Sequence, residues 1–272
     1  MAEPLLVATD LVVAYPSRRR VVWRSAPPVR ILKGIDVTIN RGETVGIVGE
    51  SGSGKTTLGR ALLGLIKPLS GAVTFAGKPV AGEERQMRPL RRRMQMIFQD
   101  PMSSLNPRHT IGRILAGPAL LHGLAASPDA AAALIADVLV QVGLPVATMA
   151  RYPHELSGGQ RQRVGIARAA ILKPDFVVAD EIVSGLDVST QAQVLQMLRD
   201  LRREMGLALA FISHDLAVVR SMCDRVYVMR DGAVEEEGEC GPLFAAPKAA
   251  YTRELIDAIP LPVRDPDWLK GG

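Results

Sequence analysis

The sequence has little cysteine and no long apolar run. Only two cysteines occur in 272 residues, Cys223 and Cys240, and their spacing matches neither a disulfide framework nor a set of metal ligands. So few cysteines are typical of a reducing compartment. No run of about 18 apolar residues occurs, so the sequence predicts no segment that spans a bilayer. The first residues lack the basic start and apolar stretch of a secretion signal, and we expect none.

Aromatic side chains are scarce as well, at 4% of the sequence, but the apolar fraction of 47% is enough for a substantial core. The length predicts one or two domains. The net charge is +5. A modest basic excess is compatible with nucleic acid or an anionic membrane surface, and it is also common in cytosolic enzymes, so charge alone does not identify a partner.

The most informative stretch is residues 45–58, where a short apolar strand leads into a glycine-rich loop and the start of a helix. Residues 49–56, GESGSGKT, fit the phosphate-loop pattern GxxxxGK[ST]. Its glycines let backbone N–H groups approach an anion at a helix N-terminus. Lys55 would reach the β- and γ-phosphates, and the Thr56 hydroxyl would bind Mg²⁺. An ordinary Gly/Ser loop is the alternative, but the strand before it and the helix-forming run after it favour phosphate binding.

Two further apolar stretches end in polar side chains. Residues 176–181 read FVVADE, so Asp180 and Glu181 follow a strand of the kind that is buried on both faces. Ligands bind at the carboxyl ends of such strands, where Asp180 would hold Mg²⁺ and Glu181 would orient or deprotonate the attacking water. His214 follows the apolar residues 207–212 and could donate to a γ-phosphate. The alternatives are that the two acids only cap a helix and that His214 is an ordinary loop residue.

A second glycine-containing helix start lies at residues 156–163, LSGGQRQR. Ser157 is a good N-cap for a helix over residues 160–172, and Gly158 and Gly159 leave room for an anion at its N-terminus. A helix start without a ligand is the alternative.

The rest of the chain predicts further elements. Residues 16–30 lack periodicity and predict a loop, whose basic triplet at 18–20 is either a solvated turn or a contact with anionic lipid or ribose-phosphate. Residues 103–150 predict a separate helical subdomain that is entered at Gln99 and left near Tyr152. The remaining predictions are strands at residues 5–15, 31–39, 44–48 and 94–98, a hairpin at 72–78, a strand pair at 224–239 and a loosely ordered tail at 260–272.

Together these motifs resemble the ATP-binding-cassette (ABC) ATPases. The phosphate loop, Gln99, the LSGGQ segment, VVADE, the SGLD sequence at 184–187 and His214 occur in the family's order between residues 5 and 239. LSGGQ distinguishes this family from other phosphate-loop proteins. Residues 98–108 and 247–260 are similar to those of dipeptide and oligopeptide importer ATPases, a subgroup that includes nickel, glutathione and opine importers.

The resemblance implies an α/β fold, a phosphate-loop ATPase core with an antiparallel β subdomain and an inserted α-helical subdomain. It places an ATPase domain at residues 1–240, with the helical subdomain at about 100–165, and a C-terminal extension at 241–272. In two positions the sequence departs from the family pattern, since Ile182 and Gly185 stand where proline and alanine are common. Neither position carries a catalytic group, so we expect activity to survive.

The resemblance also implies a site shared by two subunits. Tyr15 would stack on adenine, with Trp23 as a weaker rival, and Gln99 would sense Mg²⁺ and the γ-phosphate. Asp180, Glu181 and His214 would complete one half-site, and Asp187 would line the interface. The triphosphate would be wrapped by Gly49, Glu50, Ser51, Gly52, Ser53, Gly54, Lys55, Thr56 and Thr57. ATP bound by the partner would be closed over by Ser157, Gly158, Gly159 and Gln160.

The implied function is ATP hydrolysis, with ATP and Mg²⁺, in an importer of peptides or a related small solute. The implied partners are transmembrane permease subunits, a second ATPase subunit and an extracytoplasmic solute-binding protein, at the cytoplasmic face of the cell membrane. A soluble ABC ATPase acting on nucleic acid, an exporter ATPase and a non-hydrolysing regulatory cassette are the rivals. We expect no nucleic-acid partner, and no iron–sulfur cluster because Cys240 stands alone near the C-terminus.

Overall fold

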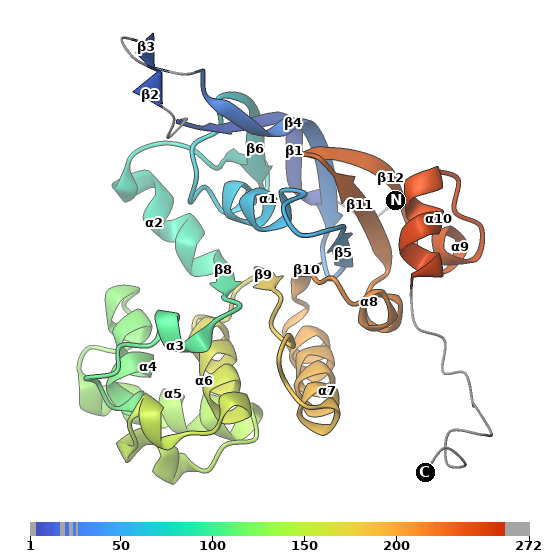
Figure 1. Cartoon of the computed structure of the whole chain (residues 1–272). Coiled ribbons are helices and arrows are strands. Elements are labelled where there is room, and N and C mark those ends of the chain that lie inside the picture. Colours follow the sequence, from blue (N-terminus) through green and yellow to red (C-terminus); the bar gives the residue numbers. More distant parts are fainter. Residues whose placement is uncertain (1–3, 17–19, 22–23, 26, 259–272) are drawn as a thin grey trace, which may run out of the picture.

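The larger sheet of the protein is built around the strand that precedes the phosphate loop. The computed structural model describes residues 4–16, 20–21, 24–25 and 27–258 (Figure 1). The six-stranded sheet has the order β12-β11-β5-β10-β9-β8, in which β12 pairs antiparallel and the other pairings are parallel. Its strands are β5 (Thr44–Val48), β8 (Met94–Ile97), β9 (Phe176–Asp180), β10 (Ala208–Ile212), β11 (Arg225–Arg230) and β12 (Ala233–Glu239).

The central strands of this sheet have continuous apolar sequences because both of their faces are covered. Every residue of β5, β9 and β10 is buried. Strand β5 has the predicted bounds, and β9 lies within the predicted run at residues 176–181 and ends one residue earlier. Because these strands run parallel, their carboxyl ends meet at one edge of the sheet.

A second, antiparallel sheet lies beside the first and has the order β4-β1-β6-β7. Its strands are β1 (Pro4–Tyr15), β4 (Val29–Asn40), β6 (Ser70–Phe75) and β7 (Lys78–Pro79). Helix α1 (Lys55–Leu62) lies between the two sheets and contacts strands of both (Figure 1). The approach is close at Gly59, where an added Cβ would come within 2.8 Å of Val178 and 2.9 Å of Ile212. This packing fixes where the phosphate loop lies relative to both sheets.

The inserted helices form a group below the sheets in Figure 1. Their N-termini are capped locally, since Thr110 accepts from Arg113 N–H and Ser127 from Ala130 N–H. Their apolar faces share one continuous core with one face of the large sheet. The elements are α3 (Pro101–Ser104), α4 (Ile111–Leu121), α5 (Pro128–Gln141), η1 (Val146–Ala150), η2 (Pro153–Glu155) and α6 (Gly158–Ala170).

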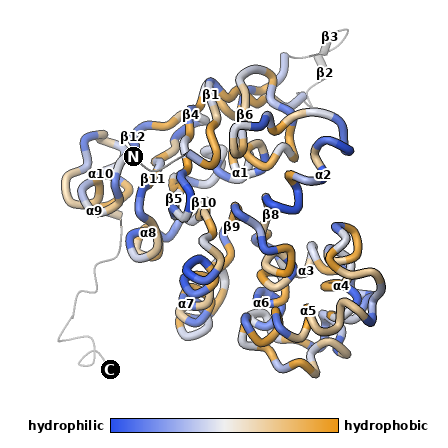
Figure 2. Tube along the Cα trace, turned by 180° about the vertical axis from the view of Figure 1, so that it is seen from behind, coloured by the Kyte–Doolittle hydropathy of each residue, from blue (hydrophilic) through white to orange (hydrophobic). Residues whose placement is uncertain are grey.

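The remaining helices flank the large sheet. The arginine-rich α2 is largely hydrophilic, whereas α7 carries both polar and apolar residues (Figure 2). Two short helices of the C-terminal region, α9 and α10, lie beside β12 (Figure 1). These helices are α2 (Glu84–Arg93), α7 (Val188–Met205), α8 (Leu216–Met222), α9 (Cys240–Ala245) and α10 (Ala250–Asp257). None of the helices in the described ranges has both the length and the apolarity needed to span a bilayer.

The prediction of a plain loop at residues 16–30 was wrong. The segment contains a two-stranded pair, β2 (Arg20–Val21) with β3 (Arg24–Ser25). The reason is that β1 and β4 stay paired up to Tyr15 opposite Val29, which brings the two ends of the insertion side by side. Trp23 and the predicted tail at 260–272 lie outside the described residues, and the domain division at residue 240 stays a prediction.

Candidate nucleotide site

The phosphate loop joins β5 to α1 and surrounds the ammonium group of Lys55. Its Nζ donates to the carbonyl oxygens of Gly49 and Glu50, at 2.8 and 2.7 Å. The side chain is only 5% exposed. Burial lowers the pKa of Lys55, and the nearby carboxylates of Glu181 and Asp180 oppose that shift. The buried charge is therefore held by carbonyl oxygens that a phosphate can replace.

Glycine is required at the first position of the loop. Gly49 has φ 145°, and a Cβ there would lie 2.1 Å from the carbonyl oxygen of Met229. Helix α1 begins after Gly54, and no side chain caps it. The first N–H groups of α1 are therefore left to face a ligand in the loop, as an anion site requires.

Asp180 and Glu181 occupy the carboxyl end of β9 but differ in environment. The Thr56 hydroxyl donates to Asp180 Oδ1 at 3.0 Å, and Asp180 is 3% exposed. Burial raises the pKa of Asp180, with a further contribution from Glu181, while the Thr56 hydrogen bond opposes the shift. Glu181 leaves the strand with φ 47°, a left-handed conformation that a non-glycine residue rarely adopts. Its side chain is 20% exposed.

The Glu181 carboxylate meets side chains that follow two neighbouring strands. Gln99 Nε2, after β8, donates to Glu181 Oε2 at 2.8 Å. His214 Nδ1, after β10, lies 3.5 Å from the same oxygen. Because β8, β9 and β10 are parallel neighbours, residues that are far apart in the sequence converge at one edge of the sheet.

A cavity of about 400 Å³ lies over the phosphate loop. Tyr15 lies at this cavity and is 40% exposed, so its ring is accessible to a ligand. Ile31 reaches the cavity from β4, and it was not predicted because no motif distinguishes it. The lining residues are Tyr15, Ile31, Ser51, Gly52, Gly54, Lys55, Thr56, Thr57, Gln99 and Glu181.

The LSGGQ segment does not line this cavity. Ser157 caps α6 as predicted and accepts from Gln160 N–H, while the Gln160 side chain accepts from Ser157 N–H. Ser157 and Gly158 are exposed. An added Cβ at Gly158 would meet nothing within 4 Å, whereas one at Gly159 would lie 2.5 Å from Thr190 of α7. The helix start predicted as a second anion site is thus capped by its own residues and lies apart from the cavity over the phosphate loop.

Comparison with known proteins identifies the family. A family model described as ABC transporter matches residues 32–184. The chain is 51% identical over 265 residues to a putative peptide import ATP-binding protein of Brucella ovis, covering 97% of this chain and 80% of the relative. The chain belongs to the ABC transporter family. It is also 46% identical over 269 residues to the oligopeptide transport ATP-binding protein OppF of Escherichia coli, covering 98% and 80%.

Solved structures confirm the predicted ABC ATPase fold. The ATP-binding cassette MJ0796, solved as a dimer bound to ADP and Pi, matches with a TM-score of 0.76 and 28% identity. The match covers 86% of this chain and 98% of that chain. The protein is therefore an ABC transporter ATPase that binds ATP, and it groups with ATP-binding proteins of peptide import.

The two departures of this ABC transporter ATPase from the family pattern are accommodated by the fold. Ile182 is 1% exposed and packs in the core shared with the inserted helices. Gly185 has φ 74°, a conformation that favours glycine over alanine. Neither residue lines the cavity over the phosphate loop.

The oxygen atoms beside the phosphate loop suit Mg²⁺. A hydroxyl and a carboxylate, from Thr56 and Asp180, lie 3.0 Å apart, and both offer the oxygen ligands that Mg²⁺ prefers. A bound cation would offset the cost of burying the Asp180 charge, which burial otherwise disfavours. The residues present therefore fit the ion.

Proposed function

We propose that this ABC transporter ATPase drives uptake of peptides or chemically related small solutes, with each ATP held between two ATPase subunits. The observation that carries the shared site is the separation of its two halves. Lys55, Asp180 and Glu181 are assembled within one chain, whereas Ser157–Gln160 present an exposed helix start elsewhere on the same chain. An exposed, preformed anion site on a chain that already has a phosphate loop suits a nucleotide bound by another subunit.

Within one half-site, each residue has a separate role. Lys55 exchanges the Gly49 and Glu50 carbonyls for phosphate oxygens, and the loop N–H groups surround the triphosphate. Tyr15 stacks on adenine at the mouth of the cavity. Ser157, Gly158, Gly159 and Gln160 of the second subunit close over the γ-phosphate, and Asp187 lies at the shared interface.

Hydrolysis depends on Glu181. Its carboxylate orients the attacking water and takes up its proton, while Gln99 and His214 hold that carboxylate from either side. His214 also donates to the γ-phosphate. Mg²⁺ would be held by Thr56, Asp180 and Gln99, and it would neutralise charge that develops on the phosphates.

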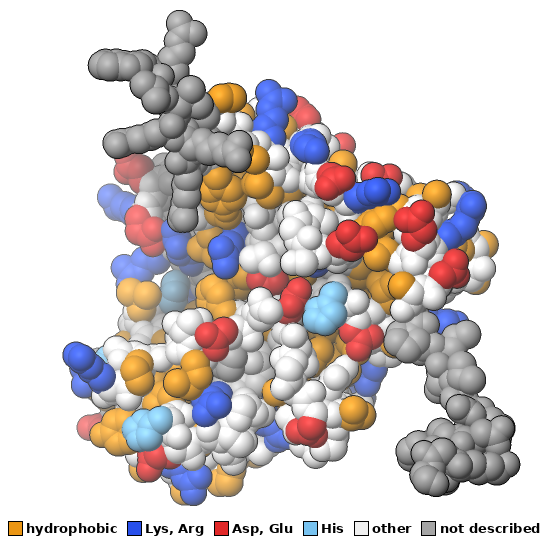
Figure 3. All heavy atoms as spheres, viewed as in Figure 1, with side chains coloured by type: hydrophobic (Ala, Val, Ile, Leu, Met, Phe, Trp, Pro, Cys, Tyr) orange, Lys and Arg blue, Asp and Glu red, His pale blue; other side chains and the backbone are white. Residues whose placement is uncertain are grey.

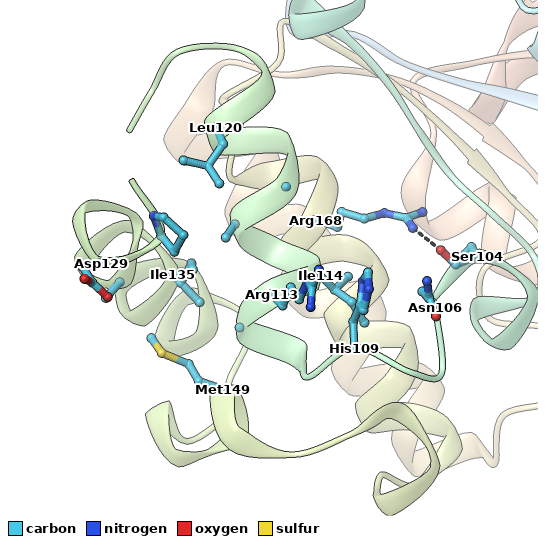
Figure 4. Close-up of a pocket in the computed structure, with 15 residues that line it drawn as sticks. Ser104, Asn106, His109, Arg113, Ile114, Leu120, Asp129, Ile135, Met149 and Arg168 are labelled. Atoms are coloured by element: carbon cyan, nitrogen blue, oxygen red, sulfur yellow. Dashed lines mark hydrogen bonds between the residues drawn. The ribbon is translucent and has the colours of Figure 1, made fainter. Parts of the chain in front are cut away.

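The inserted helices offer a place for the membrane subunit. A cavity of about 820 Å³ lies among α3, α4, α5 and η1, with Ile135 and Met149 on its apolar wall and His109 and Arg113 at its polar side (Figure 4). An apolar groove with a polar rim suits a short amphipathic helix. We assign it to a cytoplasmic helix of a transmembrane permease.

The groove is connected to Glu181 through Arg168 of α6. Arg168 donates to the Ser104 carbonyl at the groove (Figure 4), and its guanidinium lies 5.8 Å from the Phe98 ring centre. Phe98 precedes Gln99, which donates to Glu181. A shift of the docked helix would thus move Gln99 and change its hydrogen bond to the Glu181 carboxylate.

The permease would hold the protein at the cytoplasmic face of the cell membrane, and an extracytoplasmic binding protein would deliver the solute. The second ATPase subunit would be a related chain or another copy of this one. On the face shown in Figure 3, acidic and basic side chains are interspersed, with no continuous basic patch of the kind that binds nucleic acid.

The test is reconstitution of the chain with its permease and second ATPase subunit in liposomes. We expect ATPase activity to rise with binding protein and a di- or oligopeptide, and Glu181→Gln to abolish that rise. Glutathione and Ni²⁺ are the alternative solutes. Stimulation by DNA or RNA without the membrane subunits would overturn the proposal.

A further inference from the structure

Helix α10, in the C-terminal region, reaches the phosphate loop. The Tyr251 hydroxyl accepts a hydrogen bond from the Glu50 N–H at 3.1 Å, although the two residues are 201 positions apart. Tyr251 is 4% exposed, and the Arg230 guanidinium lies over its ring at 4.8 Å from the centre. The hydroxyl is therefore fixed in place beside the loop. Residue 251 lies outside the family-matched residues 32–184.

Tyr251 and Lys55 bind opposite sides of the same peptide unit, the one between Gly49 and Glu50. The carbonyl oxygen of Gly49 accepts from Lys55 Nζ at 2.8 Å, and the N–H of the same peptide, on Glu50, donates to Tyr251. A peptide unit is planar, so fixing its N–H also fixes the direction of its carbonyl. Gly49 gives the loop no side chain to restrain this plane, and its φ of 145° is open to glycine alone.

The helix that carries Tyr251 is anchored to the sheet. The Glu236 carboxylate of β12 accepts from the N–H groups of Lys248 and Ala249, at 2.9 and 3.0 Å, just before α10 begins. Arg230, which covers the ring, is the last residue of β11. Tyr251 is therefore held by contacts with β11 and β12 while its hydroxyl bonds to the loop.

We infer that Tyr251 is a positioning residue for the phosphate loop, which holds the Gly49–Glu50 peptide in its binding orientation. When Lys55 turns to a phosphate, the Gly49 carbonyl loses its partner, and the bond to Tyr251 is then what keeps the peptide from rotating. The inference rests on the proposed role of residues 49–57 in holding the triphosphate. It makes the C-terminal region part of the nucleotide site.

Tyr251→Phe tests this inference, and the chain offers a matched control in Tyr227→Phe. The Tyr227 hydroxyl also accepts a backbone N–H at 3.1 Å, from Thr38, and Arg225 lies over its ring at 5.4 Å. It accepts from Arg225 Nη2 at 3.1 Å and donates to the Thr38 carbonyl at 3.4 Å as well, so the control variant also loses these two contacts. Tyr227 is 1% exposed, and Arg225 pairs with Val45, toward the end of β5 away from the loop. Each variant loses one buried hydroxyl, so both should melt at a lower temperature than wild type.

Affinity for MgATP is measured on the full chain by displacement of a fluorescent ATP analogue, and KM and kcat on the assembled transporter. We expect Tyr251→Phe to weaken ATP binding and raise KM by about 3- to 10-fold with kcat little changed, the effect of losing one hydrogen bond. Tyr227→Phe should leave both values at the wild-type level.

Hydrogen exchange of the Glu50 amide gives a second measurement that does not depend on activity. It should be faster in Tyr251→Phe and unchanged in Tyr227→Phe. Wild-type affinity together with unchanged Glu50 exchange in Tyr251→Phe overturns the inference, as does equal weakening in both variants. If the wild-type chain itself fails to bind MgATP, the phosphate-loop proposal fails as well, so the two failures are distinguishable.

Discussion

The two predicted anion-binding regions of this protein differ in completeness. At the phosphate loop, residues from several strands of the sheet and from α1 meet within one chain, where Lys55, Asp180 and Thr56 are partly or fully buried. At the LSGGQ segment, the helix start is capped by its own residues, while Ser157 and Gly158 face outward. On the proposal made above, the first region would hold a nucleotide within one chain, and the second would meet only a nucleotide bound by another chain.

This difference suggests how ATP binding could be coupled to dimer closure. Burial lowers the pKa of Lys55 and raises that of Asp180, so the first region pays a desolvation penalty that a ligand relieves. The second region carries no such buried charge. The phosphates of a nucleotide held by the first region would place negative charge against the LSGGQ helix start of the partner. Closure of the dimer would therefore follow ATP binding.

The largest effect is expected from Glu181→Gln, which acts on the first region alone. The amide cannot take a proton from water, so turnover should fall by about 10²–10⁴-fold while ATP still binds. Because the nucleotide is then not consumed, a closed ATP-bound dimer should accumulate, seen by light scattering. Normal turnover would contradict the assignment of the base.

Lys55→Ala provides the opposite control for that experiment. It should abolish measurable ATP binding and therefore dimer formation, because the variant loses the mobile charge that meets the phosphates. Unchanged ATP affinity in this variant would argue against the phosphate-loop assignment.

Gly158→Ala tests the second region alone. The new Cβ meets nothing within 4 Å in its own chain, so the melting temperature and ATP affinity of the isolated chain should not change. In the dimer the methyl group would lie between the helix start and the partner's nucleotide, and ATPase activity should fall by about 10- to 100-fold.

Gly165→Ala is the matched control on the same helix. Its Cβ also meets nothing within 4 Å, and alanine in a helix should stabilise the protein by about 0.5–1 kcal/mol without changing activity. Full activity of Gly158→Ala would contradict the proposal that the LSGGQ helix start faces the partner's nucleotide.

The smallest effect concerns Asp187, which caps α7 beside the LSGGQ segment. Hydrogen bonds from the Ser189 hydroxyl, and then from Thr190, hold the pKa of Asp187 well below its usual value. A carboxyl with a lowered pKa in the folded state stabilises it fully above the unfolded pKa of about 4, and that contribution is lost as the pH falls further.

Thermal melts of wild type and Asp187→Asn between about pH 7 and pH 3 measure this contribution. The asparagine still caps the helix but does not titrate, so the stability advantage of wild type should shrink at acidic pH. An advantage that is constant over this range would show that the Asp187 charge does not contribute.

Local sequence patterns were sufficient for much of the fold and of the first half-site. The mostly apolar residues 44–48 predicted β5 with its observed bounds, and the run at 176–181 predicted β9, which ends one residue earlier. Both strands are buried along their whole length, which is why most of their residues are apolar. The phosphate-loop pattern located Lys55 and Thr56 because its glycines and its lysine lie within eight consecutive residues. Such patterns involve only residues close in sequence, so they can be recognised without knowing the fold.

Long-range contacts could not be predicted in the same way. Nothing near residues 20–25 indicates β2 and β3, which form because β1 and β4 bring their ends together. Ile31 reaches the nucleotide cavity from β4 through the pairing of the second sheet, and its local sequence is that of any buried strand.

By itself the sequence determined that this chain has a phosphate loop, two acids at the carboxyl end of a buried strand and a second glycine-containing helix start, because each depends on neighbouring residues. Only the tertiary structure decided that Gln99 and His214 meet on one oxygen of Glu181, that the LSGGQ segment lies apart from its own phosphate loop, and that Tyr251 holds the Glu50 amide. The reason is physical, since the order of strands in a sheet and the packing of a C-terminal helix against it depend on the burial of the whole core.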